Sequence, residues 1–220
     1  MGLVYNQTSD NVDYRLFDYT NKVAVTMKKN IQIQNHNHKG QVRIIAGRWR
    51  GRKLPVLLSQ DLRPTGDRIR ETLFNWLQFE WEGSIWLDAF SGSGALSFEA
   101  LSRGADRVVM LEQNRSVAQQ LKSNAQTLQT VSAQIIETDT WQWLKTAPVT
   151  PFDGIFLDPP FRDERVDELV QVIKDRGWLK PQGWLYFEQP KSRPIQLSGW
   201  VNHRLQQTGD VQFGLWTLSE

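Results

Sequence analysis

From residue 84 onward, short apolar runs alternate with longer amphipathic stretches. The apolar runs predict strands over Ser84–Asp88, Arg107–Glu112, Ala133–Glu137, Phe152–Asp158, Gly183–Glu188, Val201–Gln207 and Val211–Leu218. The amphipathic stretches predict helices over Ala95–Ser102, Ser116–Leu128, Thr140–Lys145 and Arg165–Lys174. This alternation favours an α/β fold with a parallel sheet, helices on both faces and ligands at the carboxyl ends of the strands. The turn Thr208-Gly209-Asp210 predicts a hairpin, so we expect the final strand to be antiparallel.

The first 40 residues follow a different pattern. They are polar, rich in Asn and Gln, and show no steady period, so we expect a flexible extension with at most a short strand over Val23–Met27. His36 and His38 alternate and could contact a metal. Two histidines without a third ligand are a weak metal signal, and we expect no metal site.

Residues 41–80 predict a hairpin and a helix. Val42–Gly47 has strand character, and the chain then turns through Gly47–Leu54. A helix is expected over Asp67–Phe79, capped at Thr65 or Gly66, with an apolar stripe facing the rest of the fold. We therefore expect three parts: an extension (1–40), a basic hairpin and helix (41–80) packed on the main domain, and that domain itself (81–220).

Positive charge is concentrated in this second part. The chain carries a formal net charge of +2, but residues 39–70 hold nine Lys or Arg against two acids, while residues 71–220 are net acidic. Basic side chains interleaved with an indole suit RNA phosphates and unpaired bases. The candidate RNA-binding residues are Arg48, Trp49, Arg50, Arg52, Lys53, Arg63, Arg68 and Arg70. The alternative is a solvated basic segment, in which Arg68 and Arg70 pair with Asp67 or Glu71.

The overall composition excludes several classes of protein. None of the 220 residues is cysteine, which excludes disulfides, thiolate catalysis and Cys-ligated zinc. No apolar run is long enough to span a membrane, and residues 1–30 lack the order of a signal peptide. We therefore expect a cytoplasmic protein without a membrane partner, and a monomer.

An acid followed by a glycine-bearing turn ends the first strand of the main domain. Asp88 precedes Gly92 and Gly94, which let the backbone approach a ligand closely. The third glycine of a dinucleotide fingerprint is missing, and no lysine follows as in a phosphate-gripping P-loop. A carboxylate here would repel pyrophosphate and attract the cationic amino group and sulfonium of S-adenosylmethionine. A simple tight turn would explain the glycines but would not use Asp88.

Acids also end the next two strands. Glu112 is placed to hold a ribose diol. Asp139 either accepts from an adenine amine or caps the next helix. The candidate cofactor-binding residues are Asp88, Phe90, Ser91, Gly92, Gly94, Glu112, Asp139 and Thr140.

The fourth strand ends in Asp158-Pro159-Pro160-Phe161. Two prolines end the ladder and stiffen the turn, and Pro159 offers a carbonyl but no N–H. Acceptors beside an aromatic ring suit a stacked base whose exocyclic amine is to be methylated. The candidate catalytic residues are Asp158, Pro159 and Phe161. An ordinary exit from strand to loop is the alternative.

These motifs together resemble the RsmD family of bacterial small-subunit (16S) rRNA guanine-N2 methyltransferases. The similarity runs from about Val42 to the end of the sequence, and residues 1–40 fall outside it. It rests on Ile45–Leu54, Leu62–Leu77, Asp88–Leu96, Glu99–Ala105 and Asp158–Phe161. The resemblance implies a seven-stranded class I (Rossmann-like) methyltransferase sheet, S-adenosylmethionine as cofactor, and a guanine in small-subunit rRNA, free or within an assembling 30S particle, as substrate.

Three other functions use part of this pattern. An adenine-N6 methyltransferase shares the D-P-P-F motif but usually carries a sizeable target-recognition domain. A non-enzymatic RNA-binding module explains the basic segment but leaves Asp88, Glu112 and Asp158 unused. A nicotinamide dehydrogenase lacks the third glycine and has no need for Pro159-Pro160.

Overall fold

The computed structural model describes residues 2–8, 11–17, 24–27, 39–57, 66–163 and 165–219. The chain divides into two compact units, residues 1–37 and residues 38–220. Arg63, one of the candidate RNA-binding residues, and the histidine pair His36 and His38 lie outside the described residues.

The first unit contains a three-stranded antiparallel sheet. Its strands are β1 (Gly2–Thr8), β2 (Asn11–Phe17) and β3 (Ala24–Met27), in the order β1-β2-β3. The expectation of an extension with no regular structure beyond one strand is therefore wrong for β1 and β2. A signal was present, because apolar and polar residues alternate along Val12-Asp13-Tyr14-Arg15-Leu16, the period of a strand.

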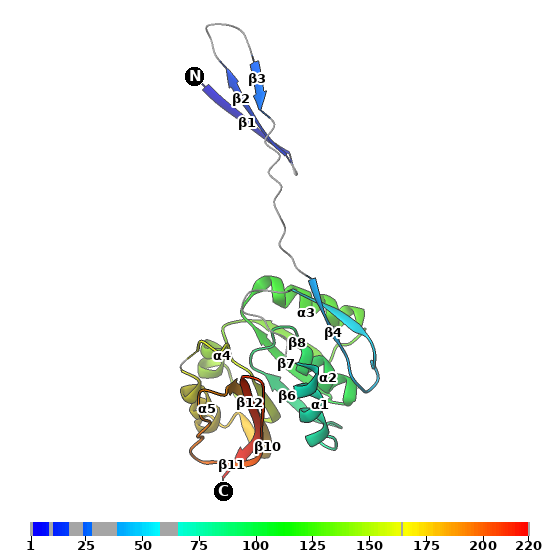
Figure 1. The fold of residues 1–220 in the computed structure, drawn as a ribbon, viewed down its shortest axis with the longest axis vertical. Coiled ribbons are helices and arrows are strands. Elements are labelled where there is room, and N and C mark those ends of the chain that lie inside the picture. Colours follow the sequence, from blue (N-terminus) through cyan, green and yellow to red (C-terminus); the bar gives the residue numbers. More distant parts are fainter. Residues whose placement is uncertain are drawn as a thin grey trace. The chain divides into compact units, whose positions relative to one another are not determined.

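The second unit is built on a seven-stranded sheet. Its strands are β6 (Ile85–Asp88), β7 (Arg107–Glu112), β8 (Ala133–Glu137), β9 (Phe152–Leu157), β10 (Leu179–Pro190), β11 (Trp200–Thr208) and β12 (Val211–Leu218). They lie in the order β11-β12-β10-β9-β6-β7-β8 (Figure 1). Five neighbouring strands, β10, β9, β6, β7 and β8, are parallel to one another. Strand β12 is antiparallel to both of its neighbours, β10 and β11, which confirms the predicted hairpin.

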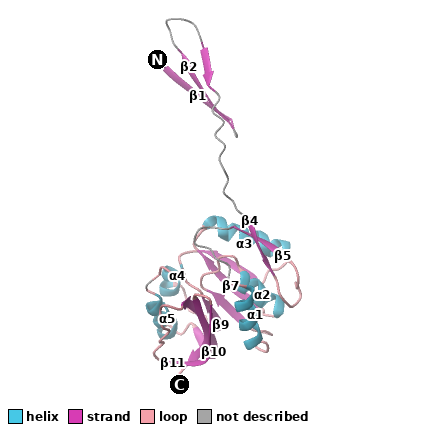
Figure 2. Ribbon diagram, in the orientation of Figure 1, coloured by secondary structure: helices cyan, strands magenta, loops and turns pink. Residues whose placement is uncertain are grey.

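Five helices are described in this unit. They are α1 (Asp67–Trp76), α2 (Ala95–Arg103), α3 (Arg115–Thr127), α4 (Thr140–Thr146) and α5 (Val166–Asp175). Helices α1, α2 and α3 contribute to one apolar cluster and α4 and α5 to another, so the sheet is covered on both faces (Figures 1 and 2).

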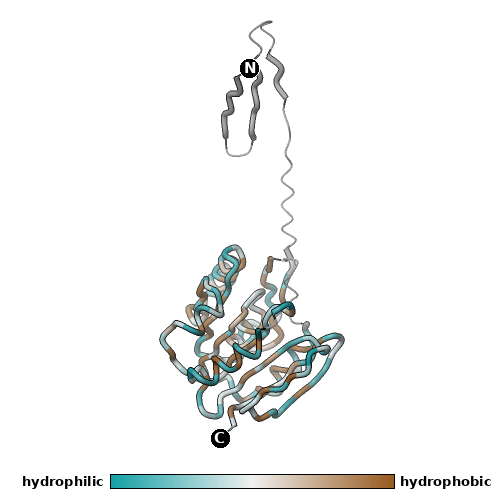
Figure 3. Tube along the Cα trace, turned by 90° about the vertical axis from the view of Figure 1, so that its left-hand side faces the viewer, coloured by the Kyte–Doolittle hydropathy of each residue, from teal (hydrophilic) through white to brown (hydrophobic). Residues whose placement is uncertain are grey.

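Successive residues of a strand contribute in turn to the two apolar clusters. Phe156 of β9 belongs to the cluster under α1 to α3, whereas Ile155 and Leu157 belong to the cluster under α4 and α5. Figure 3 shows hydrophobic stretches alternating with hydrophilic ones along the trace of the second unit. Strands buried on both faces explain the nearly continuous apolar runs of the sequence.

A two-stranded hairpin, β4 (Lys39–Arg43) and β5 (Lys53–Leu57), precedes α1. It packs on α3, where Asn124 Nδ2 donates to the Pro55 carbonyl at 3.0 Å. Ile44 and Leu54 enter the same cluster as the helices α1 to α3. The hairpin thus belongs to the compact unit of the main sheet. We term the segment from the end of β4 to the first residue of β5, residues 44–53, the basic turn.

Candidate active site at the carboxyl edge of the sheet

The order of strands reverses beside β6. The chain passes from β6 to β7 and β8 on one side, then returns to β9 on the other, and β6 pairs with both β7 and β9. In an open α/β sheet a ligand crevice lies at such a switch point, outside the carboxyl ends of the strands. Asp88, Glu112 and Asp158 all occupy this edge, at or directly after the ends of β6, β7 and β9.

The glycine loop, residues 89–94, is tied to the strands on either side. The Ala89 N–H donates to the Phe156 carbonyl, and the Ser91 N–H to the Leu111 carbonyl, both at 3.0 Å. Gly94 has φ +73°, and a Cβ at this position would lie 2.7 Å from side-chain atoms of Leu121 and Phe98. Both the backbone conformation and the space therefore require glycine at residue 94.

Asp88 is enclosed beneath this loop. Its residue is 3% exposed, and its Oδ2 accepts a hydrogen bond from Ser97 Oγ at 2.5 Å. Burial raises the pKa of Asp88 to about 7, and the negative charge of Glu112 adds to the rise. Asp88 is therefore only partly ionised at neutral pH, and a cation placed beside it would favour its charged form.

Glu112 joins the end of β7 to the glycine loop. Its Oε2 accepts from the Gly92 N–H at 3.0 Å, and its Oε1 accepts from the Asn114 N–H at 2.7 Å. Burial raises its pKa as well. The backbone of Gln113 also donates to this carboxylate, and because two carboxylate oxygens offer about four lone pairs, Glu112 can still accept from a ligand hydroxyl.

The other predicted cofactor residues have mixed environments. Asp139 is exposed and caps α4, accepting from the Gln142 N–H at 2.8 Å, so the capping alternative is the one observed. Thr140 is buried, and its hydroxyl donates to the Ala89 carbonyl. Phe90 is half-buried against the apolar cluster of α4 and α5, and Ser91 is buried.

The proline ledge, residues 158–161, follows β9. Asp158 is half-buried and Pro159 buried, whereas Pro160 is exposed and the Phe161 ring is 42% exposed. Asp163, just beyond the ledge, accepts from Trp141 Nε1 at 2.9 Å through Oδ2, and its carbonyl accepts from Arg193 Nη1 at 2.9 Å. The ledge thus presents an aromatic face next to a half-buried acid, and the segment after it is fixed to two other parts of the fold.

A second pair of polar groups at this edge was not predicted. The Tyr186 hydroxyl donates to Glu188 Oε2 at 2.6 Å, and both residues are buried. Burial, followed by the charges of Glu188 and Asp158, raises the pKa of Tyr186 well above its usual value. Burial also raises the pKa of Glu188, although the hydrogen bond from Tyr186 opposes this. The signal was available, because Glu188 ends the predicted strand Gly183–Glu188 just as the other acids end theirs.

Most of the basic candidates reach solvent. Arg48, Arg50, Arg52, Lys53 and Arg68 are exposed. The Arg48 guanidinium lies over the Trp49 ring, 4.0 Å from its centroid, and Arg52 Nη1 donates to the Thr127 carbonyl at 3.2 Å. Trp49 itself is 9% exposed and belongs to the core, so the prediction that its indole meets an RNA base is wrong.

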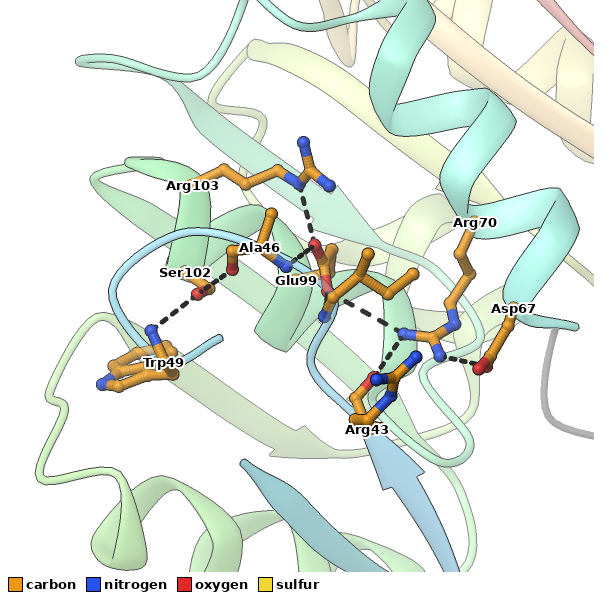
Figure 4. A network of polar contacts seen from close by, with 9 residues as sticks. Arg43, Ala46, Trp49, Asp67, Arg70, Glu99, Ser102 and Arg103 are labelled. Atoms are coloured by element: carbon orange, nitrogen blue, oxygen red, sulfur yellow. Dashed lines mark hydrogen bonds and ion pairs between the residues drawn. The ribbon is translucent and has the colours of Figure 1, made fainter. Parts of the chain in front are cut away.

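Arg70 lies in a buried polar network (Figure 4). It is 1% exposed, donates to Asp67 at 2.5 Å and to the Arg43 carbonyl at 3.0 Å, and lies 3.9 Å from Glu99. The prediction that Arg70 binds RNA is therefore wrong, and its alternative, a salt bridge with Asp67, is what the structure has. Arg70 lies on the inner face of α1, where its partners come from the start of the same helix, from β4 and from α2.

The described residues contain neither a cluster suited to a metal ion nor a helix that could span a membrane. No group of three or more His, Asp or Glu side chains in the described ranges is arranged to hold a metal ion. No helix of those same ranges is long and apolar enough to cross a membrane.

Comparison with known proteins decides the family. The family model described as Conserved hypothetical protein 95 matches residues 42–217. The chain belongs to this family. Within it, the chain is 48% identical to the Ribosomal RNA small subunit methyltransferase D of Haemophilus influenzae over 194 residues, 86% of this chain and 99% of the relative. The protein of the same name from Escherichia coli K12 is 42% identical over 83% of this chain and 92% of its own length. The resemblance to the RsmD family is thereby confirmed.

Solved structures agree with the fold. A putative methyltransferase, yhhF from Escherichia coli, superposes with a TM-score of 0.75 at 40% identity, covering 82% of this chain and 99% of the other. A putative methyltransferase complexed with SAH superposes with a TM-score of 0.64 at 14% identity, over 89% of this chain and 59% of the other, which supports the fold alone. The predicted class I methyltransferase sheet is confirmed. The first 41 residues lie outside the family match.

Proposed function

We propose that the protein transfers a methyl group from S-adenosylmethionine to the exocyclic N2 of a guanine in small-subunit rRNA. The observation that carries the proposal is the position of Asp158 and the proline ledge directly beside the acidic edge of β6 and β7. The names of two relatives, Ribosomal RNA small subunit methyltransferase D, support methyl transfer to small-subunit ribosomal RNA.

The edge fits a cationic cofactor. Asp88 and Glu112 both have raised pKa values because burial disfavours their charge, and within the described chain neither forms an ion pair with a lysine or arginine. A positively charged ligand would relieve this cost. Glu112 would accept from the ribose hydroxyls, and the glycine loop would lie against the ligand. When bound, S-adenosylmethionine supplies an electrophilic methyl group.

The proline ledge would hold the base. A guanine stacked on Phe161 places its N2 amine beside the Asp158 carboxylate and the Pro159 carbonyl, which accept its two hydrogens. This arrangement directs the nitrogen lone pair at the methyl carbon, and such positioning is worth roughly 7–11 kcal/mol at best. As the N–C bond forms and the bond between the methyl carbon and the sulfonium sulfur breaks, which leaves a neutral thioether, the nitrogen becomes positive. Asp158 would stabilise that charge, and the extra proton would then pass to solvent. Asp158 does not need to deprotonate the neutral amine.

The basic turn and the start of α1 would bind the phosphates around the target. Arg48, Arg50, Arg52 and Lys53 of the turn and Arg68 of α1 are suited to this role because they are exposed. We propose free rRNA or an assembling 30S particle as substrate, a monomeric enzyme, and the cytoplasm as its location, where such RNA is made.

The test is transfer of a labelled methyl group to small-subunit rRNA, to DNA and to protein in parallel. We expect label in rRNA alone, recovered as N2-methylguanine. Asp158→Ala should abolish transfer while the affinity for S-adenosylmethionine, measured by calorimetry, stays within about threefold of wild type. Full activity of this variant, or label on adenine N6, would contradict the proposal.

A further inference from the structure

The acidic residue at the end of β10 lies next to Asp158. In the register of β9 and β10, Phe156 faces Tyr186 and Leu157 faces Phe187, so one step further Asp158 faces Glu188. Phe156 and Tyr186 belong to the apolar cluster of α1 to α3, and by alternation Asp158 and Glu188 extend from that same face of the sheet. The charge of Asp158 acts on the Tyr186 hydroxyl, which independently places the three groups together.

Glu188 is a buried acceptor that forms no ion pair among the described residues. The Tyr186 hydroxyl donates to one oxygen of Glu188 at 2.6 Å. Within the described ranges, no lysine or arginine forms an ion pair with Glu188. A buried carboxylate that accepts from a neutral hydroxyl and forms no ion pair with a described residue is costly, and a neighbouring carboxylate raises that cost by repulsion. The partner that best relieves both costs is a ligand that offers two adjacent hydrogen-bond donors.

Guanine alone among the four RNA bases has such an edge. Its N1–H and N2 amine are neighbouring donors, whereas adenine offers the N6 amine beside an N1 that is an acceptor. Neighbouring strands lie about 4.8 Å apart, a spacing from which two carboxylates can each meet one of two adjacent N–H groups.

We propose that Glu188, held by Tyr186, accepts the N1–H of the target guanine while Asp158 accepts from its N2 amine, and that this pair selects guanine over adenine. The inference rests on the proposed function and assigns its base specificity to Glu188. Tyr186 acts as a positioning residue, because its hydroxyl occupies one carboxylate oxygen and leaves the other for the base.

The test uses a base that keeps the reacting amine and loses the N1–H. 2-Aminopurine has the N2 amine, but its N1 is an acceptor. Once the methylated guanosine has been mapped, it is replaced by 2-aminopurine in small-subunit rRNA by splinted ligation, and both RNAs are offered free and in reconstituted particles. Wild-type kcat/KM should be about 100-fold higher for guanine, the discrimination typical of a good hydrogen-bonding contact to a base.

Glu188→Gln should reduce this preference to within about tenfold. Because Tyr186 donates its proton, the new amide carbonyl would take that bond and leave the NH₂ group to face the base, where it suits the N1 acceptor of 2-aminopurine. Tyr186→Phe should give an intermediate preference. Glu137→Gln, the same change on an exposed residue at the end of β8, should leave the preference at the wild-type value.

The outcomes separate the inference from the function on which it rests. If wild type methylates guanine N2 but Glu188→Gln keeps the full preference at normal thermal stability, the assignment of Glu188 is overturned. If Glu188→Gln fails to fold, unchanged preference in Tyr186→Phe overturns it instead. If wild type methylates no guanine at all, the proposed function has failed.

Discussion

Glu99 Oε2 accepts a hydrogen bond from the backbone N–H of Ile45 at 2.7 Å, across 54 residues of sequence. The other oxygen accepts from the Ala46 N–H at 3.0 Å and from Arg103 Nε at 2.8 Å. Glu99 lies on α2, and α2 begins directly after the glycine loop. One helix therefore fixes both the start of the basic turn and the loop expected to face the cofactor.

Replacing Glu99 with Gln should destabilise the protein and loosen the basic turn. The amide NH₂ cannot accept the backbone N–H bonds, and breaking such a buried charge network costs about 3 kcal/mol. Urea unfolding should show this loss, and KM for rRNA should rise while the affinity for S-adenosylmethionine changes little. Glu71→Gln, on the exposed face of α1, is the matched control and should behave as wild type.

The exposed arginines of the basic turn should account for the salt dependence of RNA binding. Replacing Arg48, Arg50 and Arg52 with Ala should weaken binding and flatten the plot of log Kd against log salt, by about 0.7–0.9 in slope for each RNA phosphate that is no longer neutralised. Filter binding over a range of KCl concentrations measures the slope. Arg107→Ala, an exposed arginine at the start of β7, should leave it unchanged. If the triple variant keeps the wild-type slope, these three arginines do not contact RNA phosphates.

The pH dependence of stability should report the burial of Asp88. Its pKa is raised to about 7 by burial, so the folded state binds a proton that the unfolded state loses near pH 4. Ionising this group in the folded state is therefore unfavourable, and its contribution to stability falls as pH rises from about 4 to 7. Asp88→Asn does not titrate, so its stability relative to wild type should rise by about 2 kcal/mol between pH 5 and 8. A constant difference would show that Asp88 titrates normally.

Substitutions at two glycines with nearly the same φ can distinguish the cost of backbone strain from the cost of a steric clash. Gly94 has φ +73° and Gly83 has φ +74°, but a Cβ at Gly83 would meet nothing within 4 Å. Gly83→Ala should therefore cost about 1 kcal/mol from strain alone. Gly94→Ala should cost about 1–3 kcal/mol more, because Leu121 and Phe98 must move within the core. Only Gly94→Ala should also weaken binding of S-adenosylmethionine, which calorimetry can measure.

The sheet and its functional edge could be predicted from sequence because both depend on local signals. Apolar runs that end in Asp88, Glu112 and Asp158 mark strands and their carboxyl ends together, and the parallel arrangement brings those ends to one side. The class I fold then follows from the alternation of elements, as the strand order shows.

The partners of charged and aromatic side chains could not be predicted in the same way. Arg70 and Trp49 belong to a basic segment whose sequence resembles an RNA-binding surface. In the structure both are buried, because Arg70 lies next to Glu99 of α2 and the Trp49 N–H donates to Ser102 Oγ of the same helix. These partners are separated from them by 29 and 53 residues, and no local pattern encodes such a pairing. Glu188 is a different case, because its position at the end of a strand is a local signal, but only the register of β9 and β10 places it next to Asp158.

The direction of β12 has a consequence for the edge where Asp158 and Glu188 lie. Because that strand runs backward, its first residue pairs with Pro190, and the turn before it is joined to the chain after β10 by the bond from the Lys191 N–H to the Asp210 carbonyl at 2.8 Å. Had β12 been parallel, this flank would carry the end of a strand and a crossover connection in place of a closed hairpin. In this chain the edge proposed to select the base is therefore bordered on one side by a short hairpin, whose turn is hydrogen-bonded to the segment after β10.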